Sequence, residues 1–215
     1  MFIPNSFRQA EAGQLHALIQ AHALGLLITH GANGLQASPV PFLLYPDEGE
    51  HGVLRAHLAR ANPHWQELVT CSECLVMFQG ENGYVTPSWY PAKAETHRVV
   101  PTWNYAVVEV RGGPSVIEAP AWLRRQLDDL TRRHEGKRPR PWAVTDAPAD
   151  YIATQMKAIV GIEITITGIA GKWKMSQNKS EADRSGVVSG LRAERDPHRN
   201  PELADQVEAS NQKGG

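Results

Sequence analysis

The sequence predicts a mainly β protein, an antiparallel barrel with peripheral helices. The clearest strand is residues 161–167, where apolar and polar residues alternate as they do in a strand with one buried face. Asn33-Gly34 lies between two apolar segments, which is the strongest short-range signal for a β-hairpin. Six or seven short segments of this kind, joined by turn signals, are typical of an antiparallel barrel.

The elements are expected in the following order. A short amphipathic helix covers residues 11–22, and a buried strand follows at 24–30. Pro39 and Pro41 interrupt the return strand at 35–45; because proline cannot donate to a sheet, this strand should lie at an edge or carry a bulge. Asn62 and Pro63 are typical helix-start residues. Further strands are expected at 52–58, 75–79, 83–86, 103–111, 114–118 and 161–167, and helices at 120–134 and 151–159.

A length of 215 residues favours one compact domain with additions. The chain becomes polar after about residue 190, so we expect one domain over residues 1–190 and a mobile tail over 191–215. Hydrophobic residues make up 41% and charged residues 21%, ordinary values for a soluble globular protein. The formal net charge of −1 gives no overall attraction to nucleic acid or to anionic membranes.

The sequence also predicts a cytoplasmic protein without membrane contact. No apolar segment approaches the ~18 residues that span a bilayer, and residues 1–5 lack the basic and apolar parts of a signal peptide. Cys71 and Cys74 form a C-x-x-C pair. An apolar segment follows the pair instead of the helix typical of a redox site, and no second cysteine pair could complete a zinc site. We interpret these cysteines as structural or incidental.

The first candidate site is the strand-to-helix junction at residues 57–65. A helix N-terminus carries unpaired N–H groups that attract anions, and Arg60 lies just before it with His57 and His64 on either side. One interpretation is a phosphate site for a nucleotide-like ligand. The other is an ordinary capped helix with a solvated arginine.

Two further segments carry aromatic and amide groups. Trp103, Asn104 and Tyr105 enter a strand, where they could stack on a planar ring or simply pack together. Residues 171–179 combine three lysines, a tryptophan and three neutral hydrogen-bonding side chains, which suit a phosphate or a polar heterocycle, or form a solvated loop. No catalytic motif is present, so an enzyme of this sequence would take its chemistry from a cofactor.

These segments together resemble the PaiB-type family, the FMN-binding negative transcriptional regulators. The resemblance extends in order over roughly residues 1–190. It rests on the following segments: Met1-Phe2-Ile3-Pro4, 57–63, Tyr84-Val85-Thr86-Pro87-Ser88-Trp89-Tyr90, 93–96, Val100-Pro101-Thr102-Trp103-Asn104-Tyr105, Pro141-Trp142-Ala143-Val144 and 171–178. It implies an FMN-binding split β-barrel, a Greek-key antiparallel barrel related to pyridoxamine-phosphate oxidases and flavin reductases. Members are usually homodimers with FMN at the subunit interface.

The resemblance also implies roles for individual residues. Arg60 and Asn62, with His57 beside them, occupy the positions that hold the FMN phosphate. Trp103, Asn104 and Tyr105 occupy those that meet the isoalloxazine ring or the partner subunit. The residues that close the site are Lys174, Ser176, Gln177 and Asn178. Ser38-Pro39-Val40-Pro41 departs from the Thr-His-Leu-Pro of close members, and the Arg/Lys pattern of the oxidases is absent. The oxidase substrate is therefore not expected.

Three functions follow from this resemblance. The first is a homodimeric negative transcriptional regulator. Its DNA contact would use a basic patch on the helix at 120–134 and the following loop, or these residues form an ordinary solvated surface; they are Arg124, Arg125, Arg132, Arg133, Lys137, Arg138 and Arg140. The second is an FMN-dependent oxidoreductase, similar to flavin reductase or pyridoxamine-phosphate oxidase, without DNA binding. The third is a flavin-responsive binding module that performs no catalysis. We expect the regulator, with the oxidoreductase as the main alternative.

Overall fold

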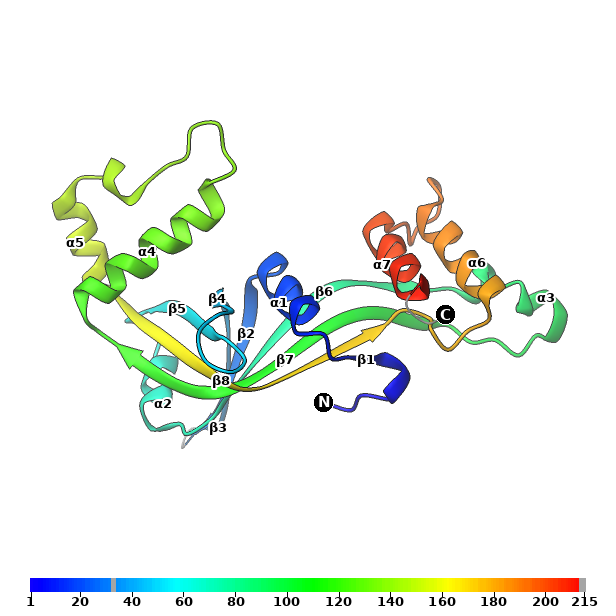
Figure 1. The fold of residues 1–215 in the computed structure, drawn as a ribbon, viewed down its shortest axis with the longest axis horizontal. Coiled ribbons are helices and arrows are strands. Elements are labelled where there is room, and N and C mark those ends of the chain that lie inside the picture. The colour runs from blue at the N-terminus through cyan, green and yellow to red at the C-terminus, as the bar shows by residue number, and fades with distance from the viewer. Residues whose placement is uncertain (32–33, 213–215) are drawn as a thin grey trace. The chain divides into compact units, whose positions relative to one another are not determined.

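The computed structural model describes residues 1–31 and 34–212, and these form a mainly antiparallel β structure with peripheral helices (Figure 1). Eight strands form one sheet in the order β3-β2-β6-β7-β8-β5-β4, and β1 pairs with β8. This confirms the predicted fold class. The strands are β1 (Arg8–Gln9), β2 (Leu24–Gly31), β3 (Gly34–Pro41), β4 (Leu43–Tyr45), β5 (Val53–Ala59), β6 (Cys74–Val85), β7 (Thr102–Ile117) and β8 (Ile159–Lys174).

The helices include four that the sequence predicts. These are α1 (Ala12–Ala21), α2 (His64–Thr70), α4 (Pro120–Glu135) and α5 (Ala149–Lys157). The sequence analysis did not anticipate α3 (Ala92–Thr96), α6 (Glu181–Arg192) and α7 (Pro201–Gln212). Short 3₁₀ turns occur at Asn5–Phe7, Pro87–Trp89 and Val144–Asp146. Within the described residues, no helix is both long and apolar enough to span a membrane.

Strands β2 and β3 form the predicted hairpin. Their pairing extends from Leu24↔Pro41 to Gly31↔Gly34, while Ala32 and Asn33 of the predicted turn lie outside the described residues. β3 ends the strand order, as the prolines predicted. The prediction of a fully buried β2 is wrong, because its side chains alternate between exposed and buried faces. An apolar run alone does not distinguish a strand buried on both faces from one that leaves a face uncovered.

Two predicted strand breaks are absent. Residues 74–85 form one strand where two were expected, and so do residues 102–117. In the second case Gly112-Gly113-Pro114 suggested a turn. A Cβ atom at Gly112 would lie 2.3 Å from the carbonyl oxygen of Thr165 on β8. The glycine therefore permits a close approach of neighbouring strands within a continuous β7, and it does not reverse the chain.

The chain divides into two compact units built from interleaved segments. Unit 1 comprises Met1–Leu18, Gln79–Val108 and Ala170–Gly215, and unit 2 comprises Ile19–Phe78 and Glu109–Ile169. In unit 2, Phe42 and Phe78 meet edge to face at 5.8 Å within a core that includes Leu54 and Ile162. In unit 1, Met175 is buried, as are residues of α6 and α7. The predicted extent of a single domain over residues 1–190 stays a prediction.

The expectation of a mobile tail after residue 190 is wrong for the described residues. Helix α6 continues to Arg192, and α7 buries Leu203, Ala204 and Val207 completely. The side chain of Asn200 caps α7 by accepting a hydrogen bond from the Leu203 amide at 2.9 Å. The polar composition of this segment reflects the exposed faces of its helices, and a few apolar residues are enough to anchor it.

Candidate functional site

Two segments of unit 1 that are distant in sequence meet through a buried hydrogen-bonded pair. Asn104, near the start of β7, is fully buried, and its side-chain amide donates to the Ser176 hydroxyl at 3.0 Å. Ser176 lies just beyond β8 with a left-handed φ of 64°, and its hydroxyl is 3.2 Å from Asn104 Oδ1. The structure therefore brings together the two segments that the sequence singled out. Since Asn104 and Ser176 satisfy each other, they position their neighbours.

Lys174 extends the same junction. Its ammonium group donates to the Thr102 hydroxyl and to the carbonyl oxygen of Trp103, the latter at 2.6 Å. Burial lowers the pKa of Lys174, and the nearby positive charges of Lys172 and Lys179 lower it further. An ammonium has three donors, so one is left for a ligand beside Trp103.

The other predicted residues of unit 1 have different environments. Gln177 folds back on the chain: its amide donates to the Trp173 carbonyl at 2.6 Å and its oxygen accepts from the Met175 amide at 2.7 Å. Asn178 is exposed in the same turn. The ring of Tyr105 is covered by the Lys172 ammonium, 5.2 Å from its centroid. Gln177 thus shapes the turn, and Tyr105 holds a cation.

Trp103 lines a cavity of about 560 Å³ within unit 1. Its side chain is 54% exposed, and it meets Tyr84 edge to face at 6.2 Å. The Tyr84 ring in turn lies 4.8 Å from that of His198. The complete lining consists of Asn82, Gly83, Tyr84, Trp103, His198, Arg199 and Asn200. Exposed aromatic faces beside amides and a guanidinium match the requirements of a planar polar heterocycle.

Three of these lining residues, His198, Arg199 and Asn200, were missed because they lie in the expected tail. Asn200-Pro201 is a helix-start signal that would have revealed α7. Trp89 holds this segment by donating from its indole N–H to Asp196 at 2.9 Å. Gly190 of α6 packs so closely on the Trp89 ring that a Cβ atom would lie 2.4 Å from it. The segment that carries His198 and Arg199 is therefore held next to the cavity.

In unit 2, the predicted phosphate residue Arg60 is held by protein groups. Its guanidinium donates to the Glu118 carboxylate at 2.6 Å and to the carbonyl oxygens of Lys157 at 3.1 Å and Ile159 at 3.3 Å. The neighbouring candidate His57 lies on β5, with its Nδ1 2.8 Å from Gln126 Oε1. Phosphate binding by Arg60 stays a prediction, and a phosphate would have to compete with Glu118.

Asn62 and His64 belong to a second polar cluster in unit 2. The Asn62 oxygen accepts from the His64 amide at 3.0 Å, at the start of the seven-residue helix α2. The His64 ring is buried, with Nδ1 2.8 Å from the Ser38 hydroxyl and Nε2 2.9 Å from the Thr29 hydroxyl. Burial lowers the pKa of His64 below its ordinary value. These contacts fit the capped-helix interpretation of the junction.

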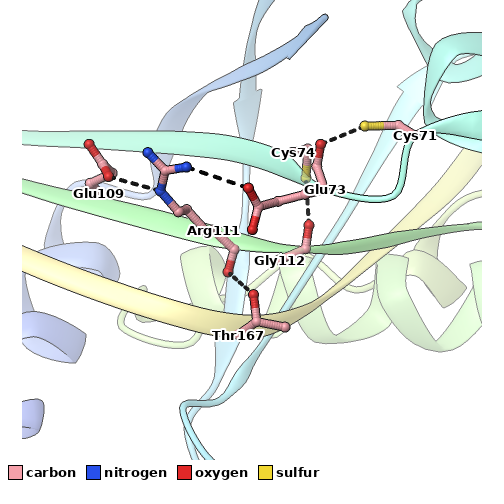
Figure 2. Close-up of polar contacts among 7 residues, drawn as sticks. All are labelled: Cys71, Glu73, Cys74, Glu109, Arg111, Gly112 and Thr167. Carbon is pink, nitrogen blue, oxygen red and sulfur yellow. Dashed lines mark hydrogen bonds and ion pairs between the residues drawn. The ribbon is translucent and has the colours of Figure 1, made fainter. Parts of the chain in front are cut away.

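The two cysteines of unit 2 are free thiols that donate to backbone carbonyl groups (Figure 2). The half-exposed Cys71 thiol donates to the Glu73 carbonyl at 2.6 Å, and the buried Cys74 thiol donates to the Gly112 carbonyl at 3.5 Å. Burial raises the pKa of Cys74 to about 12, so its thiol stays protonated and unreactive at neutral pH. No group of three metal-binding side chains occurs among the described residues. The contacts agree with a structural interpretation of the pair.

Acidic neighbours compensate three of the seven basic residues in the patch around α4. Ion pairs join Arg124 to Asp128 at 3.0 Å, Arg132 to Asp129 at 2.8 Å and Arg138 to Glu135 at 3.3 Å. Arg133 donates to the carbonyl oxygen of Gln20 at 3.2 Å. These contacts reduce the positive potential that a DNA backbone would meet.

Comparison with known proteins identifies the family of this chain and agrees with its fold. The family described as "Putative FMN-binding domain" matches residues 1–168. An uncharacterized protein of Emericella nidulans is 35% identical, covering 89% of this chain and 90% of its own length. Protease synthase and sporulation protein PAI 2 of Bacillus subtilis is 30% identical over 92% of both chains.

A solved structure shares the fold at low sequence identity. The flavocytochrome Anf3 of Azotobacter vinelandii has a TM-score of 0.57 at 15% identity, covering 83% of this chain and 75% of its own.

The family match spans most of the chain, and the PAI 2 protein is similar over nearly its full length. This chain therefore belongs to the PaiB-type family of FMN-binding proteins, with the split-barrel fold and FMN as its cofactor.

Proposed function

We propose that the chain functions as an FMN-binding homodimer and a negative transcriptional regulator of the PaiB type. The observation that supports FMN binding is the cavity in unit 1. The exposed Trp103 ring, Tyr84 and Arg199 are among its lining residues, and its volume is about 560 Å³. Beside Trp103 in the chain, Asn104 pairs with Ser176, and the Lys174 ammonium donates to the Trp103 carbonyl oxygen.

The residues around this cavity fit a flavin ring. The isoalloxazine ring would stack on the Trp103 indole, and the free donor of Lys174 and the amide of Asn82 would meet its polar edge. FMN supplies one- and two-electron transfer when bound. Phosphate binding by His57, Arg60 and Asn62 of unit 2 is a separate proposal, in which a phosphate would replace Glu118 as the partner of Arg60.

An FMN titration tests this part of the proposal. We expect one FMN per chain, visible flavin absorbance that remains with the protein on gel filtration, and quenching of flavin fluorescence by the stacked indole. Riboflavin, which lacks the phosphate, should bind more weakly. Protein that stays colourless and takes up no FMN from solution would overturn the proposal.

An uncovered apolar face in unit 2 supports the homodimer. Paired residues of neighbouring strands point to the same side of a sheet, and the outer side of β2, β3 and β6 carries consecutive apolar pairs. Leu24, Leu26 and Leu35 are 65%, 39% and 77% exposed. The apolar residues of this face are Leu24, Leu26, Ile28, Leu35, Ala37, Pro39, Pro41, Leu75 and Met77, and the exposed His30, which pairs with Leu35, lies at its edge. Contiguous apolar patches of this kind mark protein interfaces, and a symmetric dimer would cover the same patch on both copies.

Substitution of Leu26 by glutamate tests the dimer. A charge in the middle of an apolar interface must be desolvated without a partner, so Leu26→Glu should shift the protein from dimer to monomer in light-scattering measurements. Val69→Glu is the matched control, since Val69 is 62% exposed on α2, away from this face. A monomeric wild-type protein would remove the homodimer, and a variant that stays dimeric would show that the dimer does not form through this face.

The regulator role has the weaker physical support. The resemblance supports it, whereas the ion pairs on α4 leave fewer free arginines for phosphates than the sequence suggests. If DNA is bound directly, affinity for duplex DNA should fall steeply with salt, because each phosphate contact releases counterions. An affinity that does not change between low and moderate salt would exclude backbone contacts and restrict regulation to an indirect route.

Lys174 favours a second candidate function, an FMN-dependent oxidoreductase. A cation fixed by Thr102 and the Trp103 carbonyl would stabilise negative charge on a reduced flavin beside the indole. NAD(P)H oxidation with added FMN and a small acceptor measures this activity. Tight FMN binding without turnover of any acceptor would leave the regulator or the binding module.

A further inference from the structure

A second cavity lies within unit 2, between α4 and α5, which are adjacent at one end of the sheet (Figure 1). Its volume is about 530 Å³, within the range of roughly 300–1,000 Å³ that small-molecule sites occupy. None of its lining residues belongs to the aromatic cavity of unit 1. Arg60, which lies at its rim, is the single residue that it shares with the proposed phosphate site.

The wall of this cavity is an apolar helix face, on which Ile152 is buried while Ala149 and Ala153 are exposed. Ala149, Ile152, Ala153 and Met156 follow one another at the three- and four-residue spacing of a single face of α5. Pro120 and Leu123 of α4 lie opposite. The side chains of two apolar helix faces normally interdigitate, whereas the faces of α4 and α5 leave this cavity between them. The apolar stretch from Ala149 to Met156 is about 10 Å long at the helical rise of about 1.5 Å per residue.

The rim of the cavity is positively charged. It carries Arg60, Arg124 and Lys157 against one carboxylate, Glu118. Arg60 pairs with Glu118, and Arg124 pairs with Asp128. Among the described residues, the Lys157 ammonium has no acidic partner. A ligand that matches both features has an apolar body for the helix faces and an anionic end for Lys157.

We propose that the cavity between α4 and α5 binds a small amphipathic carboxylate, an organic acid with an apolar chain. The apolar chain lies along α5 between Ala149 and Met156, and the carboxylate accepts from Lys157 at the C-terminal end of that helix. This site is additional to the aromatic cavity of unit 1, with which it shares no residue, so filling it should leave the flavin ring's place unoccupied by the acid.

Calorimetric titration of the full chain with octanoate tests the site, with the neutral 1-octanol as the comparison of equal chain length. We expect one octanoate per chain and binding of octanol that is weaker by about tenfold, since the charge-assisted contact is lost. Ala153→Trp fills the cavity and should abolish octanoate binding. Gln155→Trp, on the exposed side of the same helix, should leave it unchanged. FMN uptake by both variants should equal that of the wild type.

A second pair of variants tests the charge without filling the cavity. Lys157→Gln should weaken octanoate binding by about tenfold and leave octanol binding unchanged, whereas Lys137→Gln, on an exposed loop outside the cavity, should change neither. The proposal is overturned if the wild type binds no octanoate, if octanol binds equally well, or if Ala153→Trp binds octanoate normally. A folded Ala153→Trp protein that loses FMN as well would assign the cavity to the flavin and overturn it too.

Discussion

The predicted site residues differ between the two units in how many of their polar groups are already occupied. In unit 1, Asn104 and Ser176 satisfy each other, so the Trp103 face stays exposed beside a cavity and Lys174 keeps a free donor. In unit 2, Arg60 and Asn62 are already engaged, by Glu118 and by the His64 amide. A residue of a type that suits a ligand therefore does not by itself make a binding site. Its side chain must also have hydrogen-bonding atoms or an aromatic face that no other residue occupies in the folded protein.

The largest effect is expected for Trp103→Ala. Stacking of a planar ring on an aromatic side chain contributes about 1–3 kcal/mol, so FMN affinity should fall roughly 10- to 100-fold. Trp142→Ala is the matched control, because Trp142 is 46% exposed on a loop of unit 2. Equal FMN affinity of the two variants would show that the unit 1 cavity does not hold the ring.

A somewhat smaller effect is expected for Gly190→Ala. The added methyl group would meet the Trp89 ring at 2.4 Å, and overpacking of this kind typically costs about 1–3 kcal/mol. The melting temperature should fall, and FMN affinity should fall with it if the chain end completes the cavity. Ser189→Ala, exposed on the same helix, should be neutral. A Gly190→Ala protein as stable as the wild type would mean that α6 moves away from Trp89 without cost.

Opposite changes in FMN affinity are expected for the two partners of the Arg60–Glu118 pair. If Arg60 binds the phosphate, Arg60→Gln should weaken FMN binding by about tenfold, the loss of one charge-assisted hydrogen bond. Glu118→Gln should strengthen it severalfold, because the competing carboxylate is removed. Riboflavin affinity should be the same in all three proteins. A decrease with both variants would indicate that the ion pair acts only on the fold.

The smallest effect concerns pH. Burial lowers the pKa of His64 in the folded state, so the unfolded chain binds the proton more strongly. This contribution to stability is complete above the ordinary histidine pKa of about 6.5 and decreases as the pH falls below it. Denaturation of wild type and His64→Gln between pH 7.5 and 5, a range of roughly one unit or more on either side of that value, measures it. We expect the free energy of unfolding of the variant to decline less with falling pH. Parallel curves for the two proteins would show that His64 does not contribute to the pH dependence.

The sequence predicted the elements whose signals are local. Helix α4 begins at its proline, the hairpin pairs through Gly34, and Pro39 and Pro41 lie on the terminal strand of the sheet. The continuity of β6 and β7 was not predictable from local signals. The role of Gly112 depends on how closely β8 approaches, which composition does not reveal.

The site was predictable to a similar degree. The resemblance named both Trp103 and Lys174, and in the structure the Lys174 ammonium donates to the Trp103 carbonyl oxygen, while their role in binding stays a prediction. It gave no indication that Glu118 pairs with Arg60, because the two residues are far apart in sequence. Nor did it include His198 and Arg199, since polar residues between helices have the composition of an unstructured tail.

The position of His198 and Arg199 separates the lining of the aromatic cavity into two parts. They reach the cavity on a segment after residue 168, where the family match ends, while Tyr84 and Trp103 come from strands inside it. An exchange of this short segment would change one side of the cavity and leave the strands that carry Tyr84 and Trp103 as they are. Chimeras that swap residues 193–212 between homologues would make that exchange in the laboratory.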